Sequence, residues 1–279
     1  MILSGKARLA GVLGWPVSHS RSPRLHGFWL RQLGIDGAYL PLAVAPADLA
    51  LVVRALPRMG FAGANVTVPH KEKVMALVDH LDPLAARIGA VNTLVVRPDG
   101  SLEGRNTDAF GFLENLRCGC PGWVASAGPA MVIGAGGAAR AVVAALVDAG
   151  IPEIRLTNRT AERADQLAAE LGGPIRVVPW HQRSDYLAGA ALLVNTTTQG
   201  MTGQPGLELD LSALPMTAVV NDIVYVPLET DLLARARARG NPVVDGLGML
   251  LYQAVPGFEA WFGSRPEVTD ELRAFVLAG

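Results

Sequence analysis

Short apolar runs alternate with amphipathic segments along the first third of the chain, and Gly, Pro or polar clusters separate them. Apolar runs of about four to eight residues predict buried strands, and apolar residues at helical spacing predict helices that cover a sheet. This alternation is typical of an α/β domain, for which right-handed parallel connections are expected throughout. Strands are predicted over Leu9–Gly14, Ala38–Val44, Ala64–Val68 and Val91–Arg97, and helices over Pro23–Leu33, Pro46–Met59 and Lys71–Leu81.

A stretch rich in Gly and Pro, Cys118–Pro129, interrupts the chain, and a second α/β region extends on both sides of it. The chain has 279 residues, which is long enough for two domains. We therefore expect an α/β protein of two lobes, an N-terminal α/β domain and a Rossmann-like doubly wound domain. In the second region, strands are predicted over Ala130–Ile133, Ile154–Thr157, 175–178, 191–195, 218–223 and Pro242–Asp245, and helices over Asp108–Arg117, Ala138–Ala149, Leu228–Arg239 and Leu247–Phe262.

A turn of small residues joins the strand that ends at Ile133 to the next predicted helix. Gly134 permits a tight turn, and Gly136 lets the backbone approach a pyrophosphate that the helix N-terminus faces. The alternative is a strand–helix turn that binds nothing, but the flanking strands and helix favour a dinucleotide site. The residues of the turn are Gly134, Ala135, Gly136, Gly137 and Ala138.

The segment after the next strand indicates which dinucleotide is bound. Folds that prefer NAD usually carry Asp or Glu there, about 20 residues after the glycines, to bind the ribose 2′-hydroxyl. This chain has Asn158-Arg159-Thr160, with Arg163 one helical turn later. Two guanidinium groups suit a 2′-phosphate. The alternative is that both arginines are simply solvent-exposed at a helix start, but the positive end of a helix does not stabilise cations, so this alternative does not explain their position. The sequence therefore predicts NADP(H).

Polar clusters lie at predicted strand ends and helix starts in the first domain, where α/β folds bind ligands. Asn65 and Thr67 are two residues apart in a predicted strand, so both side chains face the same side. An amide and a hydroxyl pointing together suit a polyhydroxylated ligand. Alternatives remain: Ser22 before Pro23 suits a helix N-cap, and Asn92 suits a turn. The clusters are 18–23, 65–71, 91–93 and 104–108.

Lys71 and Asp108 are the candidate acid/base pair. Only three of the 24 basic residues are Lys, and Lys, unlike Arg, exchanges a proton when its environment favours the neutral amine. Lys71 is predicted at a helix start, where the helix dipole opposes a cation. Asp108 would hold Lys71 while Lys71 transfers the proton, although a solvated Lys71 and a capping Asp108 are the alternatives. His19 and His70 are further acid/base candidates.

Composition excludes several other classes. The net charge is −1 and the pI is about 6.5, so nothing predicts binding to nucleic acid or membranes. The N-terminal segment lacks the apolar run of a signal peptide, and no apolar stretch is long enough to span a bilayer. Cys118 and Cys120 are too few for a structural zinc site, and no metal is expected. A reducing cytoplasm is the expected location.

At this point the motifs resemble those of the shikimate dehydrogenase family over almost the whole chain. The resemblance implies NADPH-dependent, reversible reduction of 3-dehydroshikimate to shikimate, in the biosynthesis of chorismate and the aromatic amino acids. It also implies a discontinuous substrate domain, 1–107 plus 242–279, around an NADP domain at 108–241. The matching stretches are Ser18–Pro23, Gly63–Pro69 with Lys71, Gly89–Thr93, Asn106–Asp108, Gly134–Arg140, Asn158–Thr160 with Arg163, Asp222–Pro227, and Asp245–Met249 with Gln253.

The resemblance also implies a role for each candidate residue. Ser20 and Ser22 would hold the substrate carboxylate, and Lys71 with Asp108 would be the catalytic pair. The turn at 134–138 would carry the pyrophosphate. The groups around the ring hydroxyls would be Asn65, Thr67, Lys71, Asn92, Asp108 and Gln253, with Tyr225 nearby. The adenosine phosphate would meet Asn158, Arg159, Thr160 and Arg163, and the nicotinamide would lie near Ile223 and Gly246.

Two other functions compete with this interpretation. A quinate/shikimate dehydrogenase would tend towards NAD, which Arg159 and Arg163 argue against. A catalytically silent NADP-binding protein would be expected to lack Lys71 or Asp108, and both are present. The sequence leaves a monomer and a homodimer open, and it offers no reason for Trp15 before Pro16.

Overall fold

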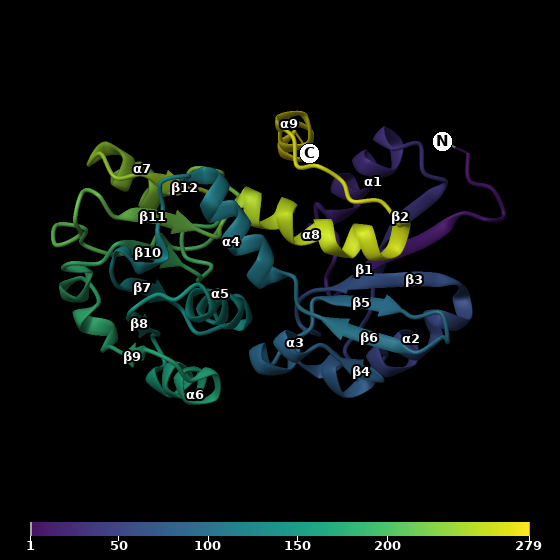
Figure 1. Ribbon diagram of the computed structural model, residues 1–279, viewed down its shortest axis with the longest axis horizontal. Helices are drawn as coiled ribbons and strands as arrows, with labels where there is room; N and C mark the ends of the chain where they lie inside the picture. Colours follow the sequence, from purple (N-terminus) through teal and green to yellow (C-terminus); the bar gives the residue numbers. More distant parts are fainter. Residues whose placement is uncertain (1, 279) are drawn as a thin grey trace. The chain divides into compact units, whose positions relative to one another are not determined.

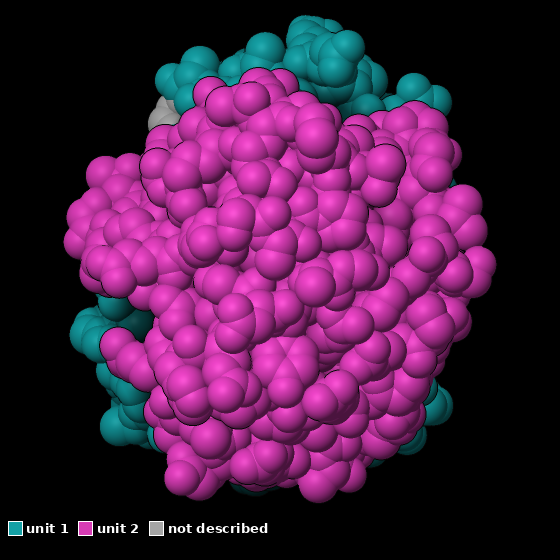
Figure 2. All heavy atoms as spheres, turned by 90° about the vertical axis from the view of Figure 1, so that its left-hand side faces the viewer, with its two compact units in different colours: residues 1–107, 251–279 teal, residues 108–250 magenta. Residues whose placement is uncertain are grey.

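The computed structural model of the protein describes residues 2–278, and the chain forms two compact units (Figure 2). Unit 1 consists of the residues up to Thr107 and those from Leu251 onward, and unit 2 is Asp108–Leu250. The sequence predicts the second boundary at 242 instead. Residues 242–250 stay with unit 2 because Val243–Val244 pairs with a strand of that unit and Asn115 donates to the Asp245 carbonyl.

Unit 1 is built on a six-stranded sheet (Figure 1). Its first three strands are parallel, whereas β5 is antiparallel to β3 and to β6, so the expectation of parallel connections throughout is wrong. The chain reverses because Asp99 accepts hydrogen bonds from the backbone and hydroxyl of Ser101. In sheet order the strands are β2 (Gly37–Ala43), β1 (Arg8–Gly14), β3 (Phe61–Val66), β5 (Thr93–Val96), β6 (Leu102–Arg105) and β4 (His80–Leu81).

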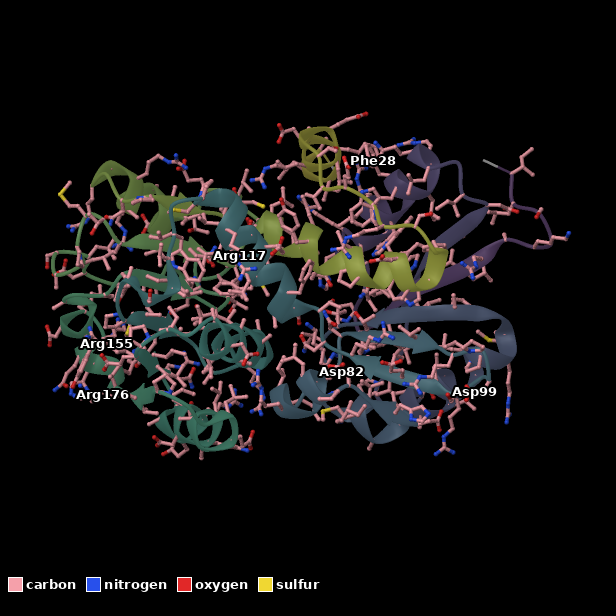
Figure 3. All side chains as sticks on the ribbon, in the orientation of Figure 1. Phe28, Asp82, Asp99, Arg117, Arg155 and Arg176 are labelled. Atoms are coloured by element: carbon pink, nitrogen blue, oxygen red, sulfur yellow. The ribbon has the colours of Figure 1, made fainter. Side chains whose placement is uncertain are left out.

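The predicted helix over Lys71–Leu81 is wrong. Its apolar residues follow helical spacing, and Val74 is buried in the core of unit 1, but only Lys73–Leu77 forms a short helix. The chain becomes extended at Val78, and β4 then pairs with β6. Asp82 (Figure 3) then caps a short helix that the sequence analysis missed. The helices of unit 1 are α1 (Ser22–Gln32), α2 (Leu49–Ala55), η1 (Pro57–Met59), η2 (Lys73–Leu77), α3 (Pro83–Ile88) and α9 (Asp270–Leu277), with most of α8 (Leu247–Phe262).

Unit 2 is a doubly wound fold around an entirely parallel sheet (Figure 1). Strand order reverses between β7 and β10, which creates the crevice where such sheets bind ligands. Arg155 and Arg176, labelled in Figure 3, lie in register on neighbouring strands β8 and β9. In sheet order the strands are β12 (Val243–Val244), β11 (Val219–Asp222), β10 (Leu192–Asn195), β7 (Ala130–Ile133), β8 (Ile154–Thr157) and β9 (Ile175–Val177). The helices are α4 (Asp108–Gly119), η3 (Ala125–Ala127), α5 (Gly137–Asp148), α6 (Ala161–Leu171), η4 (Trp180–Gln182), η5 (Asp185–Leu187) and α7 (Asp231–Ala238).

Candidate active site

The segment that carries Lys71 is held by backbone hydrogen bonds rather than by a helix. The Thr67 N–H donates to the Leu13 carbonyl over 2.9 Å, and the Val91 N–H donates to the Lys71 carbonyl over 2.8 Å. Lys71 precedes only the five-residue helix η2, so the expected opposition of a helix dipole to its charge has no basis. Thr67 likewise lies just beyond β3, not inside a strand as predicted.

Asn92 connects the Lys71 segment to the residue before Asp108. Its Oδ1 accepts from the Thr107 N–H at 2.8 Å, while its own N–H donates to the Arg105 carbonyl at 3.0 Å. The Lys71 carbonyl is therefore hydrogen-bonded to Val91, and Thr107, the residue directly before Asp108, is hydrogen-bonded to Asn92. Asp108 is also the first residue of α4, and it is buried.

Three predicted substrate-binding amides converge inside unit 1. The Asn65 Nδ2 donates to the Asn92 carbonyl at 3.1 Å and to the Thr93 Oγ1 at 3.3 Å. The Asn92 Nδ2 donates to the Gln253 Oε1 at 3.4 Å, so helix α8 brings Gln253 to residues about 160 positions earlier in the chain. Asn65, Asn92 and Gln253 are all buried. A buried cluster of amides with hydroxyls can hydrogen-bond a polyol ligand while excluding bulk water.

The two candidate serines lie around the start of α1. Ser22 is the first residue of the helix, its N-cap is Arg21, and no side chain bonds the cap, so the interpretation of Ser22 as an N-cap is wrong. The Ser20 Oγ instead accepts from the Ser22 N–H at 3.3 Å. Ser20 is half-buried and Ser22 is buried.

The alternative acid/base residues differ in accessibility. His70 is fully buried, and its Nε2 donates to the Val44 carbonyl over 2.8 Å, which gives it a structural role between two segments of unit 1. His19 is exposed. Neither His19 nor His70 joins the amide cluster through a hydrogen bond among the described residues.

A buried aromatic cluster in unit 1 lies next to the cluster of Asn65, Asn92 and Gln253. The His26 ring stacks on Tyr39 with centroids 3.9 Å apart and planes 8° from parallel, and Trp29, Phe258 and Trp261 surround it. Neither His26 ring nitrogen has a partner in hydrogen-bond geometry among residues 2–278. Burial lowers the pKa of His26 to about 3, and the Asn65 side chain opposes this shift. The sequence analysis missed this cluster, because an aromatic residue such as Tyr39 in a predicted strand is typical of an ordinary core position.

This burial makes the stability of unit 1 sensitive to acid. Between its unfolded pKa of 6.5 and its folded pKa of about 3, His26 stays neutral when folded but binds a proton when unfolded. Stability is therefore lost as the pH falls from about 6.5, by about 3 kcal/mol at pH 4.5. His26→Phe keeps the stacked ring and should remove this loss of stability. The measurement is the difference between the free energies of urea unfolding at pH 7 and at pH 4.5. His80→Phe, at an exposed histidine, should leave it intact; equal pH dependence in all three proteins would contradict the prediction.

In unit 2 the glycine turn has the geometry of a phosphate cradle. Gly134 has φ 110°, and a Cβ on it would lie 2.5 Å from the Thr196 Oγ1 across the crevice. Gly136 and Gly137 have neither a positive φ nor a described protein atom within 4 Å of such a Cβ. The protein itself therefore gives no reason for glycine at 136 and 137, whereas a ligand lying against the backbone does.

The loop after β8 is tied to this turn. The Asn158 Oδ1 accepts from the Ala135 N–H at 3.2 Å, and its Nδ2 donates to the Thr160 carbonyl at 2.8 Å. Thr160 is the N-cap of α6, but its hydroxyl makes no cap hydrogen bond. Asn158 therefore joins the two segments predicted to bind the cofactor and fixes their relative position.

Arg159 and Arg163 differ from the other arginines around them. Both are exposed, and neither guanidinium group has a hydrogen bond or ion pair with a described residue. By contrast, Arg140 pairs with Glu170, and Arg155 donates to two backbone carbonyls at 2.8 and 2.7 Å. Two unpaired guanidinium groups beside a glycine turn fit the 2′-phosphate of NADP(H).

The predicted nicotinamide residues also lie together. A Cβ on Gly246 would collide with the Ile223 carbonyl, so glycine is required for the two segments to touch. Asp222 organises this region: it accepts from the Thr230 hydroxyl at 2.7 Å, the Val224 N–H at 3.0 Å and the Asn195 Nδ2 at 3.0 Å. Burial raises the pKa of the Asp222 carboxyl above its usual range, and these hydrogen bonds oppose the rise. Tyr225 follows in the same loop of unit 2, half-buried.

Among the described residues there is neither a group of side chains suited to a metal ion nor a membrane-spanning helix. Across residues 2–278, no three His, Cys, Asp or Glu side chains are grouped so that they could hold a metal ion. In the same part of the chain, no helix has both the length and the apolar character needed to cross a membrane.

The fold and the site define the chain as an α/β protein in which a Rossmann-type dinucleotide-binding unit is joined to a polar-lined second unit. Family models match both units: the shikimate dehydrogenase substrate binding domain over 12–94, shikimate/quinate 5-dehydrogenase over 125–202, and the shikimate 5′-dehydrogenase C-terminal domain over 246–270. The chain belongs to the shikimate dehydrogenase family.

Individual relatives support the assignment. A shikimate dehydrogenase (NADP(+)) of Paramagnetospirillum magneticum is 80% identical over 276 residues, which are 99% of this chain and 100% of that one. Shikimate 5-dehydrogenase of Thermus thermophilus, solved with NADP(H) and shikimate, has a TM-score of 0.85 and 41% identity over 98% of each chain. Quinate dehydrogenase of Corynebacterium glutamicum, solved with NAD, has a TM-score of 0.91 and 33% identity over 98% of this chain and 99% of that one. The fold is thus common to enzymes with different substrates and cofactors.

Proposed function

We propose that this protein is an NADP-dependent shikimate dehydrogenase that interconverts 3-dehydroshikimate and shikimate, a step towards chorismate and the aromatic amino acids. The observation that carries the proposal is the convergence on Val91–Asn92. The segments of Lys71, Asn65, Gln253 and Thr107, the last of which precedes Asp108, all bond to this dipeptide. Relatives named as NADP(+) enzymes, at 80% and 62% identity, support the choice of substrate and cofactor.

In this proposal Lys71 accepts the proton of the hydroxyl being oxidised and returns it during reduction. Asp108 holds Lys71 in place at the reacting hydroxyl while Lys71 transfers the proton. The bound nicotinamide supplies hydride chemistry at the reacting carbon. Ser20 and Ser22 bind the carboxylate, while Asn65, Thr67, Asn92 and Gln253 bind ring oxygens, and Tyr225 is a further candidate contact.

Unit 2 holds the cofactor. The turn at 134–138 binds the pyrophosphate, because its open glycines leave the backbone accessible. The segment Asn158, Arg159, Thr160 and Arg163 binds the adenosine phosphate, and Ile223 with Gly246 lies against the nicotinamide. We further propose a cytoplasmic location, supported by the free thiols of Cys118 and Cys120, and a monomeric or homodimeric enzyme.

The test is a steady-state assay with shikimate and quinate, each with NADP and NAD. We expect the highest kcat/KM for shikimate with NADP, and weak turnover of quinate. Quinate adds a hydroxyl and lacks the ring double bond, and sites built to bind hydroxyls reject analogues that mismatch them. A quinate value equal to or above that for shikimate would overturn the assignment and favour a quinate/shikimate dehydrogenase.

A further inference from the structure

A buried hydroxyl in unit 1 holds the amide cluster from a position outside the proposed substrate contacts. Tyr39 lies on β2, which is separated from β3 by β1, and its side chain is buried. Its phenol donates to the Asn65 Oδ1 over 2.6 Å. Burial raises the pKa of Tyr39 well above its usual range, with the Ser22 hydroxyl opposing the rise, so the phenol keeps its proton.

Further hydrogen bonds link Asn65 to Asn92 through Thr93 and extend to Thr107 and Gln253. Asn65 donates to the Thr93 Oγ1 at 3.3 Å, and the Thr93 hydroxyl donates to the Asn92 Oδ1 at 2.9 Å. Asn92 then donates to the Thr107 Oγ1 at 3.0 Å, and the Thr107 hydroxyl lies 3.5 Å from the Gln253 Oε1. Each of these groups can both donate and accept, so each depends on its neighbours for its orientation.

The amide oxygens of Asn65 and Asn92 are held by different kinds of group. The Asn92 Oδ1 accepts from the backbone Thr107 N–H at 2.8 Å. The Asn65 Oδ1 accepts from the Tyr39 phenol, while its Nδ2 donates to the Asn92 carbonyl and the Thr93 Oγ1. Without the phenol, a buried carbonyl oxygen would lack its partner, and the amide would gain by rotating or by admitting water.

We propose that Tyr39 is a positioning residue that orients the Asn65 amide and, through Thr93, the Asn92 amide for binding the substrate ring. This inference rests on the proposed function. The stacking of His26 on the Tyr39 ring keeps the phenol in place, so only the hydroxyl needs to be tested.

Tyr39→Phe removes that hydroxyl and keeps the stacked ring. Losing one buried hydrogen bond should raise the KM for shikimate about tenfold. The KM for NADP and kcat should stay within about twofold, because the phenol bonds Asn65, a proposed substrate-binding residue, and neither the proposed cofactor residues nor Lys71 is changed. A merely structural loss would instead lower the active fraction, and with it kcat. The matched control is Tyr186→Phe, which removes a half-buried tyrosine's hydroxyl in unit 2.

Thr93 provides a second test if the Tyr39 variant fails to fold. Thr93→Val breaks the middle of the chain and should raise the KM for shikimate, whereas Thr93→Ser keeps the hydroxyl and should restore it. The double variant Tyr39→Phe/Thr93→Val should change KM less than the product of the single changes, because both break the same path. Additive effects would contradict the proposal.

A readout without activity separates this inference from the proposed function. In the substrate-free protein with 15N-labelled asparagine, Tyr39→Phe should speed proton exchange at the side-chain amides of both Asn65 and Asn92, and Tyr186→Phe should not. A wild-type protein that fails to oxidise shikimate would contradict the proposed function, while faster exchange at both amides would still support the positioning. Change at Asn65 alone, or at neither amide, would overturn it.

Discussion

Lys71→Ala should lower kcat for shikimate oxidation by about 10²–10⁴-fold, with little change in the KM for shikimate. A positioned acid/base contributes to the transition state, so its loss appears mainly in kcat. The substitution removes the amine but not the hydrogen bond from Val91 to the Lys71 carbonyl, so the segment keeps its place. Asn65 and Asn92, the proposed substrate-binding amides, are unchanged in this variant. Initial rates at saturating NADP with varied shikimate measure both constants.

Lys71→Arg separates proton transfer from simple positive charge. Arg keeps the charge but does not release a proton near neutral pH, so it should not restore turnover. Lys73→Ala is the matched control, because Lys73 is exposed, lies two residues away and should be replaceable without effect. Near-normal turnover with Arg at position 71 would mean that Lys71 only contacts the substrate as a cation.

The elements of unit 2 were the most predictable from the sequence. The predicted strands 130–133 and 154–157 coincide with β7 and β8 of unit 2. Each is a short, mostly apolar segment bounded by Gly, Pro or polar residues, and each lies inside the parallel sheet, so local pattern and tertiary environment agree. The doubly wound fold is confirmed for the same reason. The predicted helix 247–262 coincides with α8, most of which belongs to unit 1.

Unit 1 was less predictable where tertiary pairing competes with helical spacing. Val74, Leu77, Val78 and Leu81 fit one face of a helix, but β4 pairs with β6 and Asp82 starts a new helix. The pairing partner of β4 lies more than 20 residues later, so no local window contains the competing interaction. The argument that a helix dipole opposes the positive charge of Lys71 depended on the predicted helix, and it fails because that helix does not form.

The candidate site residues were predicted from residue type and motif, but the hydrogen bonds between them were not. Asn65 and Asn92 carry visible amide chemistry, whereas Tyr39 occupies a strand position where an aromatic side chain is ordinary core. Its phenol meets Asn65 across the intervening strand β1. Hydrogen bonds between residues so far apart in the chain depend on strand order, which the apolar pattern does not specify.

Replacing both Arg159 and Arg163 with Ala should reduce the preference for NADP over NAD in kcat/KM by about a hundredfold or more. Each charge-assisted hydrogen bond to a phosphate contributes roughly 1.5–3 kcal/mol, and about 1.4 kcal/mol is a factor of ten. The two guanidinium groups have no ion-pair partner among the described residues, so their removal should leave the folded protein intact. The change should come from a higher KM for NADP, because NAD lacks the 2′-phosphate that these groups are proposed to bind.

The control for this pair must remove positive charge from unit 2 without touching the loop after β8. Arg237→Ala does so, since Arg237 pairs with Glu229 on the exposed side of α7. If Arg237→Ala weakens NADP as much as the double variant does, the arginines act through general charge. If the double variant loses equal activity with NADP and NAD, the loop supports the dinucleotide as a whole and does not recognise its 2′-phosphate. Selective loss with NADP alone would attribute the choice of cofactor to these two side chains, which fits a shared fold that serves NADP(H) in one relative and NAD in another.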